Sequence, residues 1–184
     1  MNRLGKKQSI RNDQWIHAAE QIETLVSRDE IDTAAKKAVN DIKTRTTGLK
    51  AAYAYSGGKD SIVLSDICTK AGITGSVCGI CELEYPEFLK WIYDNMPANC
   101  TVINTGQDIV WLSKHLDMLF PKDSAKAAKW FSIVQHRAQK KYYTENGLNL
   151  ILLGRRRSDG NYTGTDGIYT NRDGITRYSP LYDW

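Results

Sequence analysis

The hexapeptide SGGKDS at positions 56–61 is the feature that most constrains how this chain folds. Residues 50–55 before it show no polar alternation after Lys50, which is typical of a strand buried on both faces of a sheet. Residues 60–71 after it carry apolar side chains at helical spacing, and Gly72 provides a stop. The pattern therefore predicts a strand, a tight glycine turn and a helix.

A glycine turn between a strand and a helix is suited to binding phosphate. Glycine lets the backbone approach a ligand without a Cβ in the way, and the first turn of the helix carries unpaired N–H groups and a partial positive charge. We expect Lys59 to neutralise the phosphates and Asp60 to bind Mg²⁺ directly or through water. The alternative is a structural turn that only caps the helix. The expected loop residues are Ser56, Gly57, Gly58, Lys59, Asp60 and Ser61.

Strands and helices alternate along the rest of the chain, which predicts an α/β fold with an open, mostly parallel sheet and helices on both faces. The expected strands are 50–55, 74–81, 100–104 and 149–153. The expected helices are 60–71, 86–97, a helix near 107–119, and a long helix at 125–145. Residues 154–176 contain five glycines, which predicts a long loop with room for a short hairpin.

Two amphipathic stretches, residues 13–26 and 30–43, precede the first strand and predict two helices. We expect residues 1–47 to form a helical segment that packs on the domain. Residues 48–184 then form a nucleotide-binding α/β domain. Packing of the helices on a partner instead, either a second copy or another subunit, stays open.

Size and composition favour an ordinary folded domain. The 184 residues include 41% hydrophobic residues, which excludes a disordered chain, and the net charge is only +4. No stretch approaches the length of a membrane span, and the amino terminus lacks the apolar run of a signal peptide. We therefore expect a cytoplasmic protein with no membrane contact and reduced cysteines. Nucleic acid is expected only as a substrate for modification.

The hexapeptide resembles the signature of the PP-loop ATP pyrophosphatases, closest to the branch of the phosphoadenosine phosphosulfate (PAPS) reductases and the ATP-sulfurylase small subunit. Residues 150–159 resemble that branch's strand ending in Gly-x-Arg with a following acidic residue, and residues 177–184 resemble its Pro-Leu-x-x-Trp segment. The resemblance implies an adenine nucleotide alpha hydrolase-like fold that binds ATP or PAPS. It places adenine near Tyr55 and Gly79.

Three arginines follow the strand at 149–153. In a parallel sheet the carboxyl ends of the strands share one edge, so we expect Arg155, Arg156 and Arg157 close to the phosphates. Guanidinium groups bind phosphate oxygens and stabilise charge on a leaving pyrophosphate. By the family pattern Gly154 is the turn, and Arg156 and Asp159 match the arginine and the acidic residue. We expect Lys59 and Arg156 to be catalytic. A solvated run of charges is the alternative.

Cys78 and Cys81 form a C-x-x-C pair at the end of the second expected strand. In some PP-loop tRNA thiolases such pairs hold an iron–sulfur cluster or carry sulfur. Residues three apart in a strand point to opposite faces, and no second pair supplies further ligands. We therefore interpret both as buried thiols and expect no iron–sulfur cluster.

Several functions remain compatible with these motifs. The reductase's nucleophilic cysteine, in a Glu-Cys-Gly motif of its tail, does not occur in these 184 residues. Adenylation of an acceptor by ATP with release of pyrophosphate is therefore our leading hypothesis, and the acceptor is unknown. PAPS reduction is an alternative if a cysteine-bearing tail follows Trp184. Transfer of sulfur to a nucleic acid or small molecule, and a non-catalytic nucleotide-binding subunit that needs a partner, are further alternatives.

Overall fold

The computed structural model describes residues 12–119 and 124–184, and its contacts divide the chain into two units, residues 1–37 and 38–184. The helix predicted at 13–26 is interrupted, whereas the helix predicted at 30–43 is longer than expected. Residues 13–26 form two pieces because Gln21 leaves the helical region at φ −101° and ψ 8°, and Val26, extended at φ −139°, ends the second piece. Ser27 and Glu30 then exchange hydrogen bonds as a capping box that starts the next helix. These helices are α1 Asn12–Glu20, α2 Ile22–Leu25 and α3 Arg28–Thr46, which continues into the second unit.

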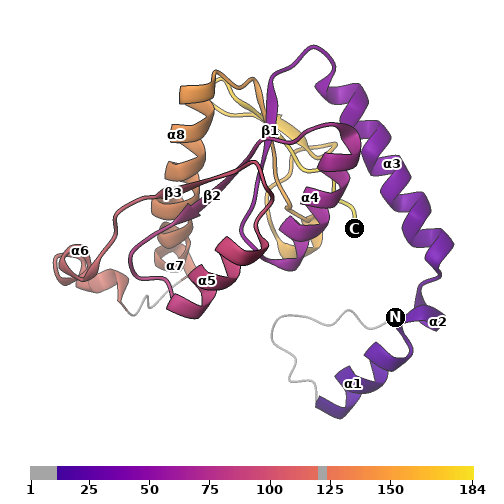
Figure 1. The fold of residues 1–184 in the computed structure, drawn as a ribbon, viewed down its shortest axis with the longest axis horizontal. Coiled ribbons are helices and arrows are strands. Elements are labelled where there is room, and N and C mark those ends of the chain that lie inside the picture. The colour runs from indigo at the N-terminus through magenta and orange to yellow at the C-terminus, as the bar shows by residue number, and fades with distance from the viewer. Residues whose placement is uncertain (1–11, 120–123) are drawn as a thin grey trace. The chain divides into compact units, whose positions relative to one another are not determined.

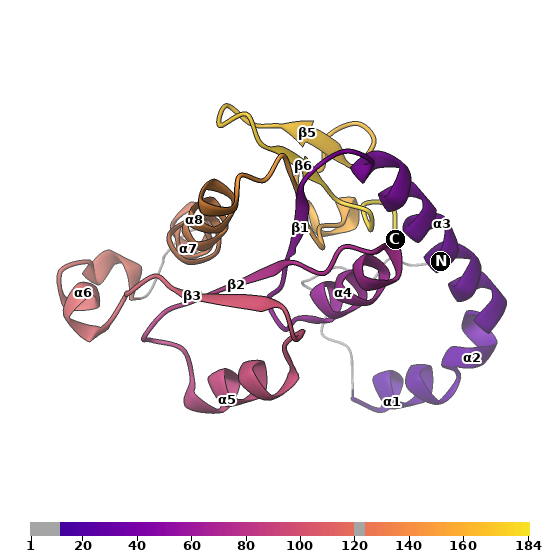
Figure 2. The ribbon, with the colours of Figure 1, turned by 45° about the horizontal axis from the view of Figure 1, so that its top comes forward.

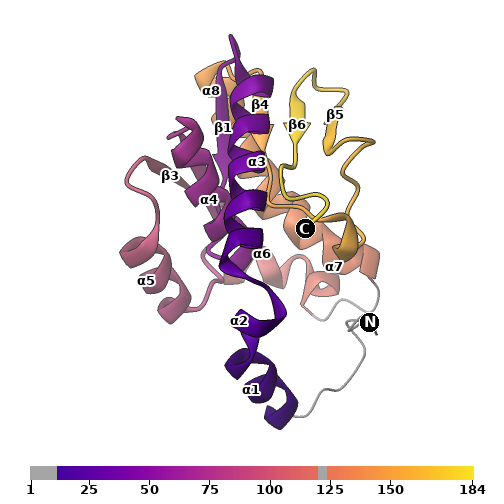
Figure 3. The same ribbon diagram turned by 90° about the vertical axis from the view of Figure 1, so that its right-hand side faces the viewer.

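The second unit is built around a six-stranded sheet (Figure 1) with the strand order β3-β2-β1-β4-β6-β5. All neighbouring strands pair in parallel except β5, which is antiparallel to β6. These two strands form a short hairpin of the kind that the glycine-rich loop was expected to allow. Figure 3 shows β5 as the outermost strand beside β6. The strands are β1 Ala51–Ala54, β2 Ser76–Ile80, β3 Cys100–Asn104, β4 Leu150–Leu152, β5 Ile168–Thr170 and β6 Thr176–Tyr178.

Helices cover both faces of the sheet, as predicted, and the side chains divide between the faces by alternation. One face buries Tyr53, Cys78 and Leu152 together with residues of α4 and α5. The other face buries Val77 and Ile151 together with α8. Figure 2 shows α7 and α8 on one side of β2 and β3 and α5 on the other. The sheet is therefore buried on both sides, as the apolar strand sequences indicated.

The helices of the second unit follow the predicted ranges with two differences. The helix expected near 107–119 is a short α-helix and a 3₁₀ turn, because His115 leaves the helical region at φ −134°. The long helix expected at 125–145 contains a π-helical turn. The elements are α4 Lys59–Ala71, α5 Pro86–Asn95, α6 Ile109–Ser113, η1 Leu116–Met118, α7 Ser124–Phe131, η2 Ser132–His136, α8 Arg137–Asn146 and η3 Arg157–Asp159.

Gly79 fixes how closely the π-helical turn approaches the sheet. A Cβ on Gly79 would lie 2.8 Å from Ala138 Cβ and 3.0 Å from the carbonyl oxygen of Val134. Gln135 Nε2 also donates a hydrogen bond of 2.8 Å to the Gly79 carbonyl oxygen. The helical segment η2 is therefore held against the carboxyl end of β2. Among the described residues, no helix combines the length and the apolar character that crossing a membrane requires.

Candidate phosphate-binding site

The loop after β1 is closed by hydrogen bonds among its own residues. Ser61 Oγ donates to the carbonyl oxygen of Gly58 at 2.8 Å and accepts from the backbone N–H of Ser56 at 3.2 Å. Gly58 is the N-cap of α4 and offers no side-chain oxygen to the first turn of the helix. The N-terminus of α4 is therefore left open to an anionic ligand.

Two glycines allow neighbouring elements to touch this loop. Gly57 has φ +71°, and a Cβ there would lie 2.7 Å from the ring of Trp91 and 2.6 Å from Ile92 Cδ1. A Cβ on Gly154 would lie 3.1 Å from the backbone oxygen of Asp60. The loop is therefore packed between α5 and the segment that follows β4. Close approach requires both glycines, and at Gly57 the positive φ requires glycine as well.

A cavity of about 260 Å³, which we call the loop cavity, lies at the carboxyl ends of β1 and β4. Most of the residues predicted from sequence to bind the nucleotide line it. The helical segment α7–η2–α8 provides its other wall. The lining residues are Ala54, Tyr55, Ser56, Gly58, Lys59, Asp60, Ser61, Phe131, Gln135, Gln139, Leu153, Gly154 and Arg155.

Arg155 is the member of the arginine triplet that lines the loop cavity. Its guanidinium donates to Tyr169 Oη and lies 3.1 Å from His136 Nε2, and it stacks over the ring of Phe131 at 5.6 Å. Burial, together with Arg155 and Arg177, lowers the pKa of His136, which favours the neutral ring that can accept this hydrogen bond. Arg155 is thus a cation held in place at the cavity wall.

Arg156 makes contacts of a different kind and is not among the residues that line the cavity. It forms two hydrogen bonds of 3.1 Å with the carboxylate of Asp159. Its Nε also lies 3.5 Å from Asp60 Oδ1, which pairs with Lys59 Nζ at 2.8 Å. The predicted catalytic pair, Lys59 and Arg156, therefore meets at one oxygen of Asp60.

Arg157 points away from this group. It donates to the carbonyl oxygen of Thr165 at 3.1 Å, lies 3.4 Å from the Asp183 carboxylate and stacks over the ring of Tyr182 at 5.2 Å. These contacts attach the loop after β4 to the carboxyl end of the chain. The three adjacent arginines thus have different surroundings: Arg155 lines the loop cavity, Arg156 pairs with the carboxylates of Asp60 and Asp159, and Arg157 contacts the carboxyl end of the chain.

The two residues expected near adenine are placed differently. Tyr55 is buried, lines the loop cavity and donates a hydrogen bond of 3.3 Å to the carbonyl oxygen of Asn95. Gly79 is covered by η2 and α8 and is not among the lining residues. Of this pair, Tyr55 alone faces the cavity.

Five lining residues were not predicted as site residues: Ala54, which ends β1, Leu153, which follows β4, and Phe131, Gln135 and Gln139 on the helical wall. Gln139 is only 5% exposed, and the described contacts give its amide no hydrogen-bond partner. Its amide atoms are not among the fully buried side-chain atoms of the described residues that lack a partner, Ser76 Oγ and Ser179 Oγ, so they remain within reach of solvent or of a ligand in the cavity. The signal available in the sequence was the helical spacing of Gln135 and Gln139, one turn apart and beside the apolar stripe.

The C-x-x-C pair is buried, as interpreted from sequence: Cys78 and Cys81 are at most 5% exposed. Burial, with Cys100 and Glu84 nearby, raises the pKa of Cys78 to about 12, so its thiol resists ionisation at neutral pH. The described lining residues of the loop cavity include no cysteine. Within the described residues, no three His, Cys, Asp or Glu side chains gather as a metal site.

Comparison with known proteins identifies the fold. No protein-family model matches the sequence, and no curated protein matches it either. A solved structure of the PAPS reductase from Candida auris, determined as a phosphate complex, matches with a TM-score of 0.59 and 17% identity, covering 86% of this chain and 81% of that one. The chain therefore has a PAPS reductase-like fold, which agrees with the predicted fold class, whereas the branch stays a prediction.

Proposed function

We propose that the loop cavity binds the phosphates of an adenine nucleotide, with ATP as the leading candidate. The observation that carries this proposal is the open N-terminus of α4, which faces a cavity flanked by Lys59 and Arg155. Backbone N–H groups, an ammonium group and a guanidinium group together form a site for phosphate oxygens. The similar PAPS reductase was solved with phosphate, which supports the same chemistry here.

Recognition of the base is assigned to the far wall of the cavity. Tyr55 and Leu153 provide apolar surface in the cavity, and the amide of Gln139, which lines the cavity, has no hydrogen bond among the described contacts. A glutamine amide pairs with both hydrogen-bonding atoms on one edge of adenine. We propose that Gln139 contributes to the choice of adenine.

The reaction that we propose is transfer of the adenylyl group. An oxygen or nitrogen of the acceptor forms a bond to the α-phosphorus, the bond from the α-phosphorus to the bridging oxygen breaks, and pyrophosphate leaves with the electron pair. The proton of the acceptor passes to solvent. Lys59 and Arg155 stabilise the charge that develops on the leaving group.

Asp60 and Arg156 act together in this proposal. Both ion pairs of Asp60 use Oδ1, so Oδ2 is the atom offered to Mg²⁺. One carboxylate combined with nucleotide phosphates suits this ion, which when bound would neutralise phosphate charge. Arg156 holds Asp60 in position, and its predicted role in turnover is exerted through that carboxylate.

PAPS is the second candidate ligand, because the fold is shared with a PAPS reductase. Reduction of PAPS requires a reactive thiol. Burial raises the pKa of Cys78, Cys81 and Cys100, which disfavours the thiolate. We therefore place PAPS binding above PAPS reduction, and the non-catalytic subunit remains the alternative to both.

The test first measures nucleotide binding and then measures turnover. Saturating ATP with Mg²⁺ should raise the melting temperature, because a ligand that binds only the native state stabilises it. Lys59→Ala should lose most of this rise, whereas Lys70→Ala, at the other end of α4 and paired with Asp66, should retain it. Formation of AMP and pyrophosphate would identify the protein as an enzyme. Binding of ATP without turnover would identify it as a non-catalytic nucleotide-binding subunit. No shift with ATP or PAPS would refute the proposal.

A further inference from the structure

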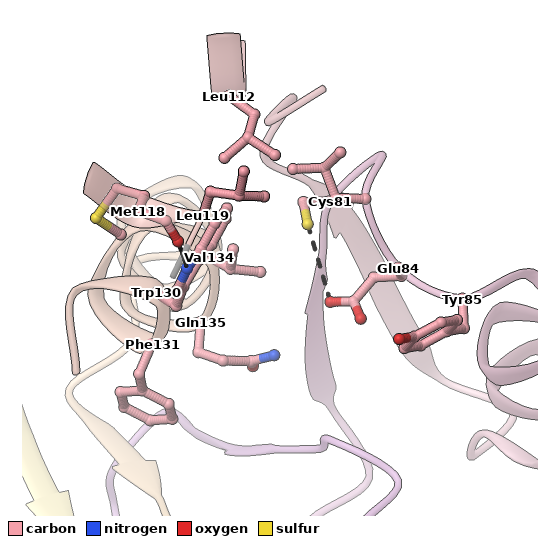
Figure 4. A pocket seen from close by; sticks show the side chains of 11 residues that line it. Cys81, Glu84, Tyr85, Leu112, Met118, Leu119, Trp130, Phe131, Val134 and Gln135 are labelled. Atoms are coloured by element: carbon pink, nitrogen blue, oxygen red, sulfur yellow. Dashed lines mark hydrogen bonds between the residues drawn. The ribbon is translucent and has the colours of Figure 1, made fainter. Parts of the chain in front are cut away.

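A second cavity, which we call the apolar cavity, has a volume of about 640 Å³ and lies beside the carboxyl end of β2. In Figure 4 the segment with Cys81, Glu84 and Tyr85 faces the segment with Trp130 and Gln135 across this space. Its volume is within the range of about 300–1,000 Å³ that is usual for small-molecule sites. The lining residues are Cys81, Leu83, Glu84, Tyr85, Leu112, Met118, Leu119, Trp130, Phe131, Val134 and Gln135.

The shape of this cavity is fixed at its floor and open at its rim. Cys81, Met118 and Val134 are buried, and Trp130 Nε1 donates a hydrogen bond of 2.9 Å to the carbonyl oxygen of Met118. Leu119 and Phe131, in contrast, remain about 45% exposed. A ligand with an apolar ring would cover these exposed side chains, which favours its binding.

The polar groups of the apolar cavity select against anions. Glu84 is half-buried on its wall, with the Cys81 thiol 3.9 Å from Oε1. Burial raises the pKa of Glu84 because its carboxylate is poorly solvated, and a cation or an N–H donor beside its oxygens would offset that loss of solvation. The described residues that line the cavity include no lysine, arginine or histidine. Phosphate and sulfate groups therefore have no partner there.

The apolar cavity adjoins the loop cavity, because Phe131 and Gln135 line both. A molecule in the apolar cavity is therefore separated from a nucleotide in the loop cavity by these two side chains. Gln135 is fixed by its bond to Gly79, and Phe131 lies under Arg155. The two cavities are therefore neighbours, and a transfer between their ligands further requires the reacting atoms to meet within about 3–3.5 Å.

We propose that the apolar cavity is the acceptor site, and that the acceptor is an uncharged or cationic ring compound that donates an N–H hydrogen bond to Glu84. The role of this compound as an acceptor rests on the proposed adenylyl transfer. Its binding in the cavity is argued from the cavity's own residues and does not depend on that reaction. The ring lies against Trp130 and the leucines, and the nucleotide occupies the neighbouring cavity at the same time.

Two matched probes test the selectivity. We would measure binding of 2-(2-naphthyl)ethylamine and of 3-(2-naphthyl)propionate by ligand-observed NMR. The two have the same ring, and one carries an ammonium group where the other carries a carboxylate. The amine should bind at least tenfold more tightly. Glu84→Gln should weaken the amine about tenfold, as expected for a charged hydrogen bond, whereas Glu87→Gln, exposed on the same segment, should leave it unchanged. Equal binding of the two probes would overturn the proposal.

Simultaneous binding with ATP separates an acceptor site from a nucleoside site. Saturating ATP with Mg²⁺ should leave the affinity for the amine within about threefold, and Leu119→Trp should block the amine while the thermal shift with ATP persists. Competition between ATP and the amine, or loss of the ATP shift in Leu119→Trp, would mean that the apolar cavity holds the nucleoside, and would overturn the proposal. Amine binding without any ATP binding would refute the adenylyl transfer and with it the acceptor assignment, and would leave a ring-binding site.

Discussion

The loop cavity and the apolar cavity share a wall but are built in opposite ways. The loop cavity is built around the short loop after β1 and the open end of α4, with the cations Lys59 and Arg155 in its wall and with α7, η2 and α8 on its other side. The apolar cavity is made from segments distant in sequence, carries the half-buried carboxyl group of Glu84, and has no cationic residue among its described lining. The first is suited to anions and the second to rings that donate hydrogen bonds. The difference indicates that the two cavities hold different molecules.

The loop cavity depends on the packing of the loop after β1 against α5. Of the variants proposed here, Gly57→Ala should therefore cause the largest loss of stability. A left-handed conformation costs a residue with a Cβ about 1–2 kcal/mol, and overpacking adds about 1–3 kcal/mol because the Cβ meets Trp91 and Ile92 at 2.7 Å or less. Gly72→Ala is the matched control, with φ +89° and open space around the Cβ. Urea unfolding measures both variants. Equal destabilisation would show that the contact with α5 does not support the loop.

The affinity of the loop cavity for anions depends on Arg155. Arg155→Ala should weaken ATP binding about tenfold, which corresponds to about 1.4 kcal/mol, because the cation at the cavity wall is lost. Arg157→Ala should change the affinity by less than twofold, since that side chain binds Thr165 and Asp183 outside the cavity. Isothermal titration calorimetry measures both, and Arg156→Ala in the same series shows how much is exerted through Asp60. Equal losses for Arg155 and Arg157 would mean that the triplet acts only through its net charge.

The sequence predicted the loop cavity far better than the apolar cavity, and the reason is physical. The strand, the glycines and the lysine of the loop are adjacent, so local rules for turns and helix ends predicted them. The mostly parallel sheet and the burial of both its faces also followed from the alternation of apolar segments, whereas the order of the strands in the sheet was not predicted. The helix near 107–119 did not, because its interruption at His115 is a matter of one backbone angle.

The triplet shows the limit of sequence reasoning most clearly. Three consecutive arginines look alike in a sequence, but their side chains point in different directions and bind neighbours from elsewhere in the chain. Tyr169 and His136 hold Arg155, whereas Asp60 and Asp159 hold Arg156. Trp130, Glu84 and Met118 likewise form a cavity only after three segments have folded together.

The smallest effect that we predict concerns the β5–β6 hairpin, at the edge of the sheet. Hydrogen bonds from Arg177 hold the pKa of the Asp173 carboxyl well below its ordinary value of 3.8. A depressed folded pKa stabilises the native state above the unfolded pKa, and this stabilisation is lost as the pH falls below about 4. Asp173→Asn should therefore lose less stability between pH 6 and pH 3 than the wild type. The control is Asp66→Asn, an exposed partner of Lys70. Identical urea midpoints for the wild type and Asp173→Asn at both pH values would contradict this assignment.

Hydrogen exchange of the backbone, followed by mass spectrometry with and without ATP and Mg²⁺, tests most directly the claim that the loop cavity binds the nucleotide. The amides at positions 56–62, at the N-terminus of α4, and those at Gly154 and Arg155 should exchange at least tenfold more slowly with the nucleotide. The amides at 83–85, on the wall of the apolar cavity, should be unchanged. Protection at 83–85 without protection at 56–62 would contradict the account, because it would place the nucleotide in the other cavity.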